Sequence, residues 1–171
     1  VYTHEDRVII GGIHPVNKSV ALEGSDQIKA ETFLERRELG VFNVGGSGTV
    51  KVDGEAYELA TKDCLYVGKG AKKLIFESDS SEKPAKFYIV SALAHTTYPT
   101  TKQSFADVPS ESLGSQETAN NRTLRRFIHD EGIQSCQLVM GMTTLENGSV
   151  WNSMPTHVHD RRMEVYFYFE L

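Results

Sequence analysis

The sequence is short of cysteine and of long apolar runs. It has two cysteines, Cys64 and Cys136, which is too few for a disulfide framework and gives no CxxC metal or redox motif. Each cysteine lies in an apolar run, so we expect both to be small buried side chains. No stretch is apolar enough to span a bilayer, and the N-terminal residues lack the basic-then-apolar layout of a signal peptide. We therefore predict no membrane partner.

A basic excess is also missing. Lysine and arginine number 18 against 23 acidic residues, a formal net charge of -5. Proteins that bind nucleic acid usually carry a basic patch, so we predict no nucleic-acid partner. Hydrophobic residues at 39% and charged residues at 24% are ordinary for a folded protein. We expect a soluble cytoplasmic protein of one domain or two small ones.

Apolar and polar residues alternate at period 2 along much of the chain, which predicts strands. Asp53-Gly54 is a strong signal for a two-residue hairpin turn, because both turn positions need positive φ. Residues 28–39 are the best helical candidate, and a poor one. The expected strands cover residues 39–44, 49–52, 56–59, 64–67, 73–77, 87–93, 124–128, 136–144 and 165–169. Short strands at this spacing predict an all-β sandwich or barrel.

The strand pattern lapses at residues 95–121, where Thr, Ser, Pro and Asn are dense. A loop this long is uncommon inside one compact domain, so we predict a linker there. It separates a first β unit at 1–94 from a second at 122–171. The second unit stops inside the apolar run VYFYFEL, so we expect the natural protein to continue and this unit to be truncated. The alternative is a C-terminal strand docked in a sheet.

A candidate metal site lies near the end of the sequence. His157 and His159 are at i and i+2, so in a strand both imidazoles face one side and can converge on one ion. Glu164 follows five residues after His159, an odd spacing that requires a bulge or short loop at residues 160–162. Imidazole plus carboxylate suits Zn, Fe, Mn, Ni or Co. The alternative is two surface histidines and a solvated glutamate.

The segment HVHDRRMEVYFYFEL resembles the first metal motif of the cupin superfamily. More narrowly, residues 154–169 and the earlier FLERRELGVFNVGG resemble the 4-deoxy-L-threo-5-hexosulose-uronate ketol-isomerase family. The resemblance implies two cupin-type jelly-roll units, one zinc ion per chain and a homohexamer. It also implies a ligand set of three histidines and one glutamate. His157, His159 and Glu164 match three of these, and the fourth, a histidine, is expected beyond Leu171.

The implied reaction is an aldose–ketose isomerisation of pectin and uronate breakdown. It converts 5-dehydro-4-deoxy-D-glucuronate, a small-molecule uronate, into 3-deoxy-D-glycero-2,5-hexodiulosonate. The alternatives are a cupin metal dioxygenase and a non-catalytic sugar-binding cupin. The first unit carries no HxH motif, so we expect it to hold no metal.

Residues beside the metal motif are candidates for holding the substrate. Arg161 and Arg162 could pair bidentately with the substrate carboxylate, or they could be a solvent-facing or subunit-contact pair. Tyr166 and Tyr168 share a face under strand parity and could donate hydrogen bonds to substrate oxygens, or could pack in the barrel core. The general base remains unassigned.

Overall fold

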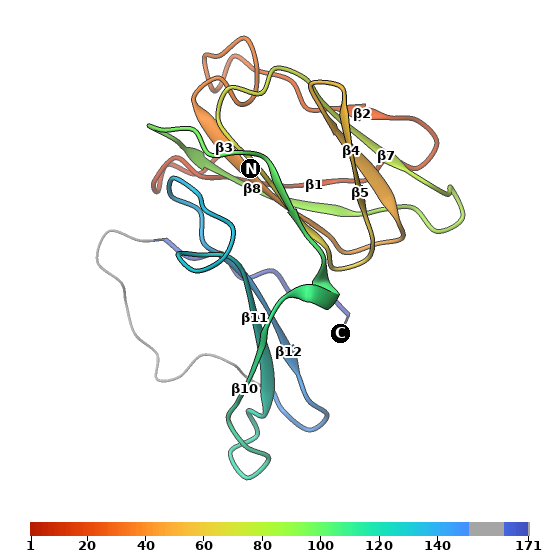
Figure 1. The fold of residues 1–171 in the computed structure, drawn as a ribbon, viewed down its shortest axis with the longest axis vertical. Helices are drawn as coiled ribbons and strands as arrows, with labels where there is room; N and C mark the ends of the chain where they lie inside the picture. Colours follow the sequence, from red (N-terminus) through yellow and green to blue (C-terminus); the bar gives the residue numbers. More distant parts are fainter. Residues whose placement is uncertain (151–162, 171) are drawn as a thin grey trace.

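The structure, a computed structural model, describes residues 1–150 and 163–170 (Figure 1). Within these residues the helical content is one 3-10 turn, η1 (Phe105–Asp107), and all pairings between strands are antiparallel. The all-β prediction is therefore confirmed. No helix in this part of the chain is long and apolar enough to cross a membrane.

Strands follow one another closely along the chain. They are β1 (Ile9–Ile13), β2 (Val20–Ala21), β3 (Arg37–Asn43), β4 (Gly48–Val52), β5 (Glu55–Leu59), β6 (Cys64–Val67), β7 (Leu74–Ser78), β8 (Phe87–Leu93), β9 (Thr101–Gln103), β10 (Ser110–Leu113), β11 (Arg122–Ile128) and β12 (Met140–Leu145).

Two sheets form a sandwich. Sheet A has five strands in the order β1-β8-β3-β6-β9, and sheet B has four in the order β2-β7-β4-β5. Leu39 and Val41 of sheet A and Val50 and Phe76 of sheet B are fully buried in the shared core. Alternation along each strand brings these side chains inward, because neighbouring residues of a strand point to opposite faces.

A third sheet covers the other face of sheet A. Sheet C has the order β10-β11-β12 and extends below the sandwich in Figure 1. A second core joins Phe42 and Tyr66 of sheet A to Phe127 and Met140 of sheet C. The rings of Phe42 and Phe127 meet edge to face with centroids 4.8 Å apart. Sheet A is thus covered on both sides, which explains why all of β3 is buried.

The predicted hairpin is confirmed. Asp53 and Gly54 have φ of 50° and 95°, and they connect β4 to β5 in register from Val52 opposite Glu55 to Gly48 opposite Leu59. The two positive φ values match the turn type whose twist suits a right-twisted strand pair.

Residues 28–39 were predicted as a weak helix, and this is wrong. The chain forms turns there and enters β3 at Arg37. Phe33 and Leu34 are both buried in the first core, in a turn that leads into β3. The guanidinium of Arg36 binds the carbonyls of Ile28 and Lys29, so a side chain satisfies acceptors that a helix would pair with backbone N–H groups.

Two strand predictions near the end differ from the structure. The strand expected at 136–144 begins only at Met140. The backbone N–H groups of residues 136–138 instead donate hydrogen bonds to the carboxylate of Glu38 in β3. Residues 165–169 form no strand. Instead Phe167 stacks on Tyr88 of β8 with centroids 4.6 Å apart, and Phe169 packs against the second core. Ring contacts place this segment, without a backbone ladder.

The predicted linker, residues 95–121, contains regular structure. Its β9 pairs with β6 at the edge of sheet A, and its β10 pairs with β11 in sheet C. Neither strand has a sustained apolar alternation, so the sequence pattern missed both. The segment therefore runs from one sheet to the other and is hydrogen-bonded to each. The division into two cupin-type units remains a prediction.

Candidate metal centre

Glu164 is the one predicted metal ligand among the described residues. Its side chain is exposed, and its Oε2 accepts a hydrogen bond of 3.0 Å from the hydroxyl of Tyr166. That bond raises the pKa of Tyr166 above its ordinary value, with partial burial adding to the effect. The residue before Glu164 is also anchored, because the Thr3 hydroxyl lies 3.8 Å from the sulfur of Met163. The bond from Tyr166 thus orients the Glu164 carboxylate.

The aromatic residues after Glu164 alternate between two sides of the chain, as expected from the sequence. Tyr166 and Tyr168 stack with centroids 6.5 Å apart and are 54% and 64% exposed. Phe167 and Phe169 form the other stack, at 5.7 Å, against the protein. The two tyrosines therefore do not pack in a barrel core in this structure, and their hydroxyls are accessible.

His157, His159, Arg161 and Arg162 lie outside the described residues. The bulge that parity requires at residues 160–162 lies there too. The convergence of the two imidazoles on Glu164 stays a prediction. The donor set is chemically suited to zinc, which takes His nitrogen and Glu oxygen ligands, and the exposed Glu164 carboxylate is accessible to an ion.

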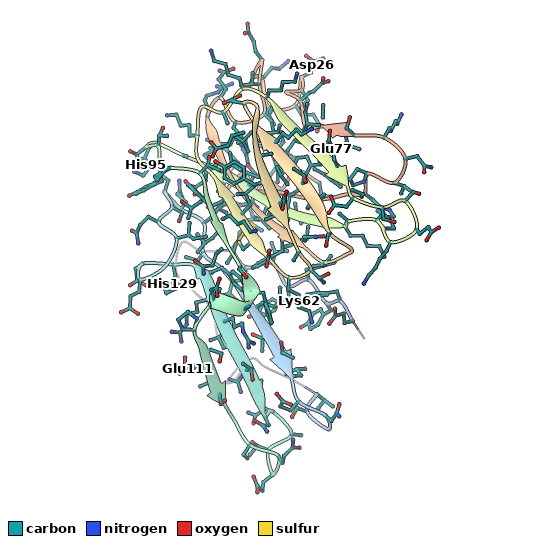
Figure 2. All side chains as sticks on the ribbon, turned by 45° about the vertical axis from the view of Figure 1, so that its right-hand side comes forward. Asp26, Lys62, Glu77, His95, Glu111 and His129 are labelled. Atoms are coloured by element: carbon teal, nitrogen blue, oxygen red, sulfur yellow. The ribbon has the colours of Figure 1, made fainter. Side chains whose placement is uncertain are left out.

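Residues 1–150 and 163–170 contain no group of three or more His, Cys, Asp or Glu able to hold a metal. His95 and His129 are well separated (Figure 2). The Nδ1 of His95 lies 3.1 Å from the sulfur of Cys136, and that of His129 lies 3.5 Å from Asp130.

The sequence reasoning missed a buried carboxylate, that of Glu38 in β3. Its side chain is fully buried and accepts four hydrogen bonds of 2.6–2.8 Å, from the Tyr66 hydroxyl and the backbone N–H groups of Cys136, Gln137 and Leu138. A buried carboxylate is costly unless it is fully hydrogen-bonded, and this one is. Glu38 thus joins sheet A to the residues that lead into β12.

Burial also shifts the pKa values of Tyr66 and Arg37. Desolvation, followed by the bond to Glu38, raises the pKa of Tyr66 well above its ordinary value. Desolvation lowers the pKa of Arg37. The signal in the sequence was a pair of adjacent charges, Arg37 and Glu38, directly before the apolar run that was predicted as a strand. Such a pair needs partners on both faces of the sheet.

Sequence comparison matches residues 1–171 to the KduI/IolB family. Relatives named 4-deoxy-L-threo-5-hexosulose-uronate ketol-isomerase share about half of their residues with this chain. The protein from Shouchella clausii is 51% identical over 170 residues, and that from Caldicellulosiruptor bescii is 54% identical over 171 residues. The protein from Formosa agariphila is 55% identical over 170 residues. These matches cover 99–100% of this chain and 61–62% of the relatives.

The fold is similar to one found in a solved structure. A crystal structure of an IolB-like protein from Salmonella typhimurium superposes with a TM-score of 0.58, covering 75% of this chain and 47% of that one. The sequence identity is 14%, so this likeness concerns the fold alone. The resemblance drawn from residues 154–169 and from FLERRELGVFNVGG is confirmed by the sequence matches: the chain belongs to the KduI/IolB family.

Proposed function

We propose that this chain takes part in a metal-dependent ketol-isomerase reaction that converts 5-dehydro-4-deoxy-D-glucuronate into 3-deoxy-D-glycero-2,5-hexodiulosonate. The observation that carries the proposal is the identity of 51–55% to relatives named as ketol-isomerases of a hexosulose-uronate, spread over nearly the whole chain. The chain spans 61–62% of the length of those relatives, so the activity is that of the whole protein.

The reaction moves a proton from C2 of the sugar to C1 through a cis-enediol. Its difficulty is the negative charge that develops on oxygen. A divalent ion bound by His157, His159, Glu164 and the histidine expected beyond Leu171 would supply Lewis-acid stabilisation of that charge. Zinc suits this ligand set, with one ion per chain.

The chain's own side chains have separate tasks in this proposal. Tyr166 donates a hydrogen bond from its hydroxyl to Glu164 and orients the carboxylate, as groups just outside a metal's ligand shell do. Arg161 and Arg162 are positioned in sequence to pair with the substrate carboxylate. The exposed hydroxyl of Tyr168 lies on the Tyr166 face, where it can reach a substrate oxygen.

The test is turnover by the full-length protein with and without a chelator. We expect complete loss of isomerisation on metal removal and recovery on adding zinc. Glu164→Gln should bind zinc more weakly and lose turnover. Glu58→Gln, an exposed carboxylate of β5, is the matched control and should keep both. Undiminished turnover after complete removal of metal would sink the proposal.

Oxygen consumption, metal content and uronate binding of the same full-length protein separate the alternatives. A cupin dioxygenase would consume oxygen and contain iron or copper. A non-catalytic cupin would bind the uronate without turning it over. The isomerase proposal includes a homohexamer, a cytoplasmic location and a role in pectin breakdown. Sedimentation of the full-length protein tests whether it is a hexamer.

A further inference from the structure

Three arginines line one pocket of the first unit. The pocket has a volume of about 300 Å³, and its lining includes Arg7, Arg36 and Arg37. It lies between the N-terminal segment, at Tyr2 and Arg7, and the turns that precede β3, with Leu93 at the end of β8 also in its wall. No Asp or Glu occurs in this lining within the described residues. The pocket therefore concentrates positive charge in a chain whose net charge is negative.

Arg37 is a buried cation without an ionic partner. Arg37 is only 3% exposed. No carboxylate in the described part of the chain forms an ion pair with it. Its Nε and Nη2 donate to the hydroxyl and carbonyl of Ser91 and to the carbonyl of Arg7. These neutral acceptors orient the guanidinium, but they leave its charge uncompensated.

One nitrogen of Arg37 stays open. Nη1 forms no hydrogen bond with another described residue, and it is not among the fully buried atoms that lack a partner. It therefore reaches accessible space, and the space beside this residue is the pocket. An oxyanion there would provide both the missing acceptor and the missing negative charge.

The side chain of Arg36 and the backbone of Arg7 are held by contacts within the protein. Arg36 donates from Nη2 to the carbonyls of Ile28 and Lys29, and its Nε lies 3.6 Å from the carboxylate of Glu35. The carbonyl of Arg7 accepts the bond from Arg37, with the backbone of Arg7 at φ of 52°. Arg36 and Arg37 are thus oriented by hydrogen bonds before an anion binds, which lowers the entropic cost of binding.

We propose that this pocket, whose lining comes from residues outside the HxH metal motif, is a binding site for a small oxyanion, the carboxylate of a sugar acid or a phosphate group. Guanidinium groups pair with either head group through two parallel N–H donors. The volume accommodates a ligand of monosaccharide size. Both arginines of the pair Arg36-Arg37 contribute, because the turn before β3 places them beside the N-terminal segment.

The test is calorimetric titration of chelator-treated full-length protein carrying Glu164→Gln, so that no metal ion contributes to ligand binding. Any binding of a carboxylate by Arg161 and Arg162 is common to all variants, so the change in Arg7→Gln and Arg36→Gln reports on this pocket. Glucuronate, inorganic phosphate and neutral glucose are the three probes. We expect glucuronate or phosphate to bind and glucose not to bind. Arg7→Gln and Arg36→Gln should each weaken binding about tenfold, the range of one charge-assisted hydrogen bond. Lys18→Gln removes an exposed charge elsewhere and is the control.

Each arm has a decisive outcome. Binding of glucuronate alone assigns the pocket to carboxylates, and binding of phosphate alone assigns it to phosphates. Equal binding of glucose, no binding of either anion, or an equal loss in Lys18→Gln would overturn the proposal. Arg7 is exposed and Arg36 is half-exposed, so circular dichroism and melting temperature should show that both variants fold. Because the metal site is disabled in this protein, the result is independent of isomerase activity.

Discussion

Glu38 shows how one side chain can decide the path of a distant segment. Its carboxylate is surrounded by four donors, of which three are backbone N–H groups about a hundred residues further along the chain. Those three residues cannot join the β11–β12 ladder, so β12 starts later than its apolar pattern suggests.

Replacing Glu38 by Gln should destabilise the protein by about 2 kcal/mol, because an amide accepts through one oxygen and turns its NH₂ group toward donors. Urea denaturation followed by circular dichroism measures this change. Glu58→Gln, on an exposed position of β5, should stay within about 0.5 kcal/mol of the parent. Equal stability of the two variants would show that the Glu38 bonds contribute nothing net.

The two cysteines differ, although both were predicted to be buried. Cys64 is fully buried, and desolvation, with Asp63 nearby, raises the pKa of its thiol far above its ordinary value. Cys136 is only partly buried and lies beside His95, so its burial was overestimated. Near neutral pH the reactive thiolate is therefore absent at Cys64.

We expect iodoacetamide to label Cys136 in the native protein and Cys64 only after unfolding. Mass spectrometry of tryptic peptides distinguishes the two sites, and labelling in urea is the positive control. Rapid native labelling of Cys64 would contradict the buried position of its thiol.

At the scale of elements, turn geometry governs the β4–β5 hairpin. Gly54 has φ of 95°, and a Cβ built there meets no neighbouring atom within 4 Å. The obstacle to substitution is thus the backbone conformation alone, not a steric contact.

Gly54→Ala should cost about 1 kcal/mol, since the left-handed region is unfavourable for L-residues. Gly12→Ala in β1 is the matched control: its backbone φ is not positive, and a Cβ there lies 4.0 Å from the carbonyl oxygen of Phe87. Thermal denaturation of both variants tests the difference. A Gly54→Ala protein that melts with or above Gly12→Ala would refute the conformational explanation.

At the scale of the whole molecule, sheet A is the shared layer. It contributes Leu39 and Val41 to the core with sheet B, and Phe42 and Tyr66 to the core with sheet C. The two cores should therefore unfold together, as cooperative transitions in small domains usually do.

Phe127 lies in the second core and is 1% exposed. Phe127→Ala removes its buried ring, so we expect the free energy of unfolding to fall by about 3–5 kcal/mol. Leu145→Ala at the exposed end of β12 is the control and should cost much less. Coincident fluorescence and circular dichroism transitions would show that sheets A and C unfold as one unit. A separate early transition for sheet C would contradict the shared-layer account.

Local pattern sufficed for several elements. Residues 64–67 and 87–93 are strands with the predicted bounds, because their apolar runs are closed by turn residues on both sides. The Asp53-Gly54 turn followed from its φ requirement. The family was recognisable from HVHDRRMEVYFYF, because the order and spacing of these residues can be read directly from the sequence.

Other features depended on contacts between distant residues. Strands β9 and β10 carry little apolar alternation and exist because β6 and β11 offer them free edges. Residues 165–169 alternate well, yet ring stacking on Tyr88 replaces a strand ladder.

The sequence by itself determined the all-β class, the main hairpin, the family and the identities of the candidate ligands, because parity and ligand spacing are local properties of a chain. Only the tertiary structure decided that sheet A is covered on both faces, that Glu38 ties it to the approach to β12, and that three arginines line one pocket. Those outcomes require side chains far apart in sequence to meet, and no local period encodes such meetings.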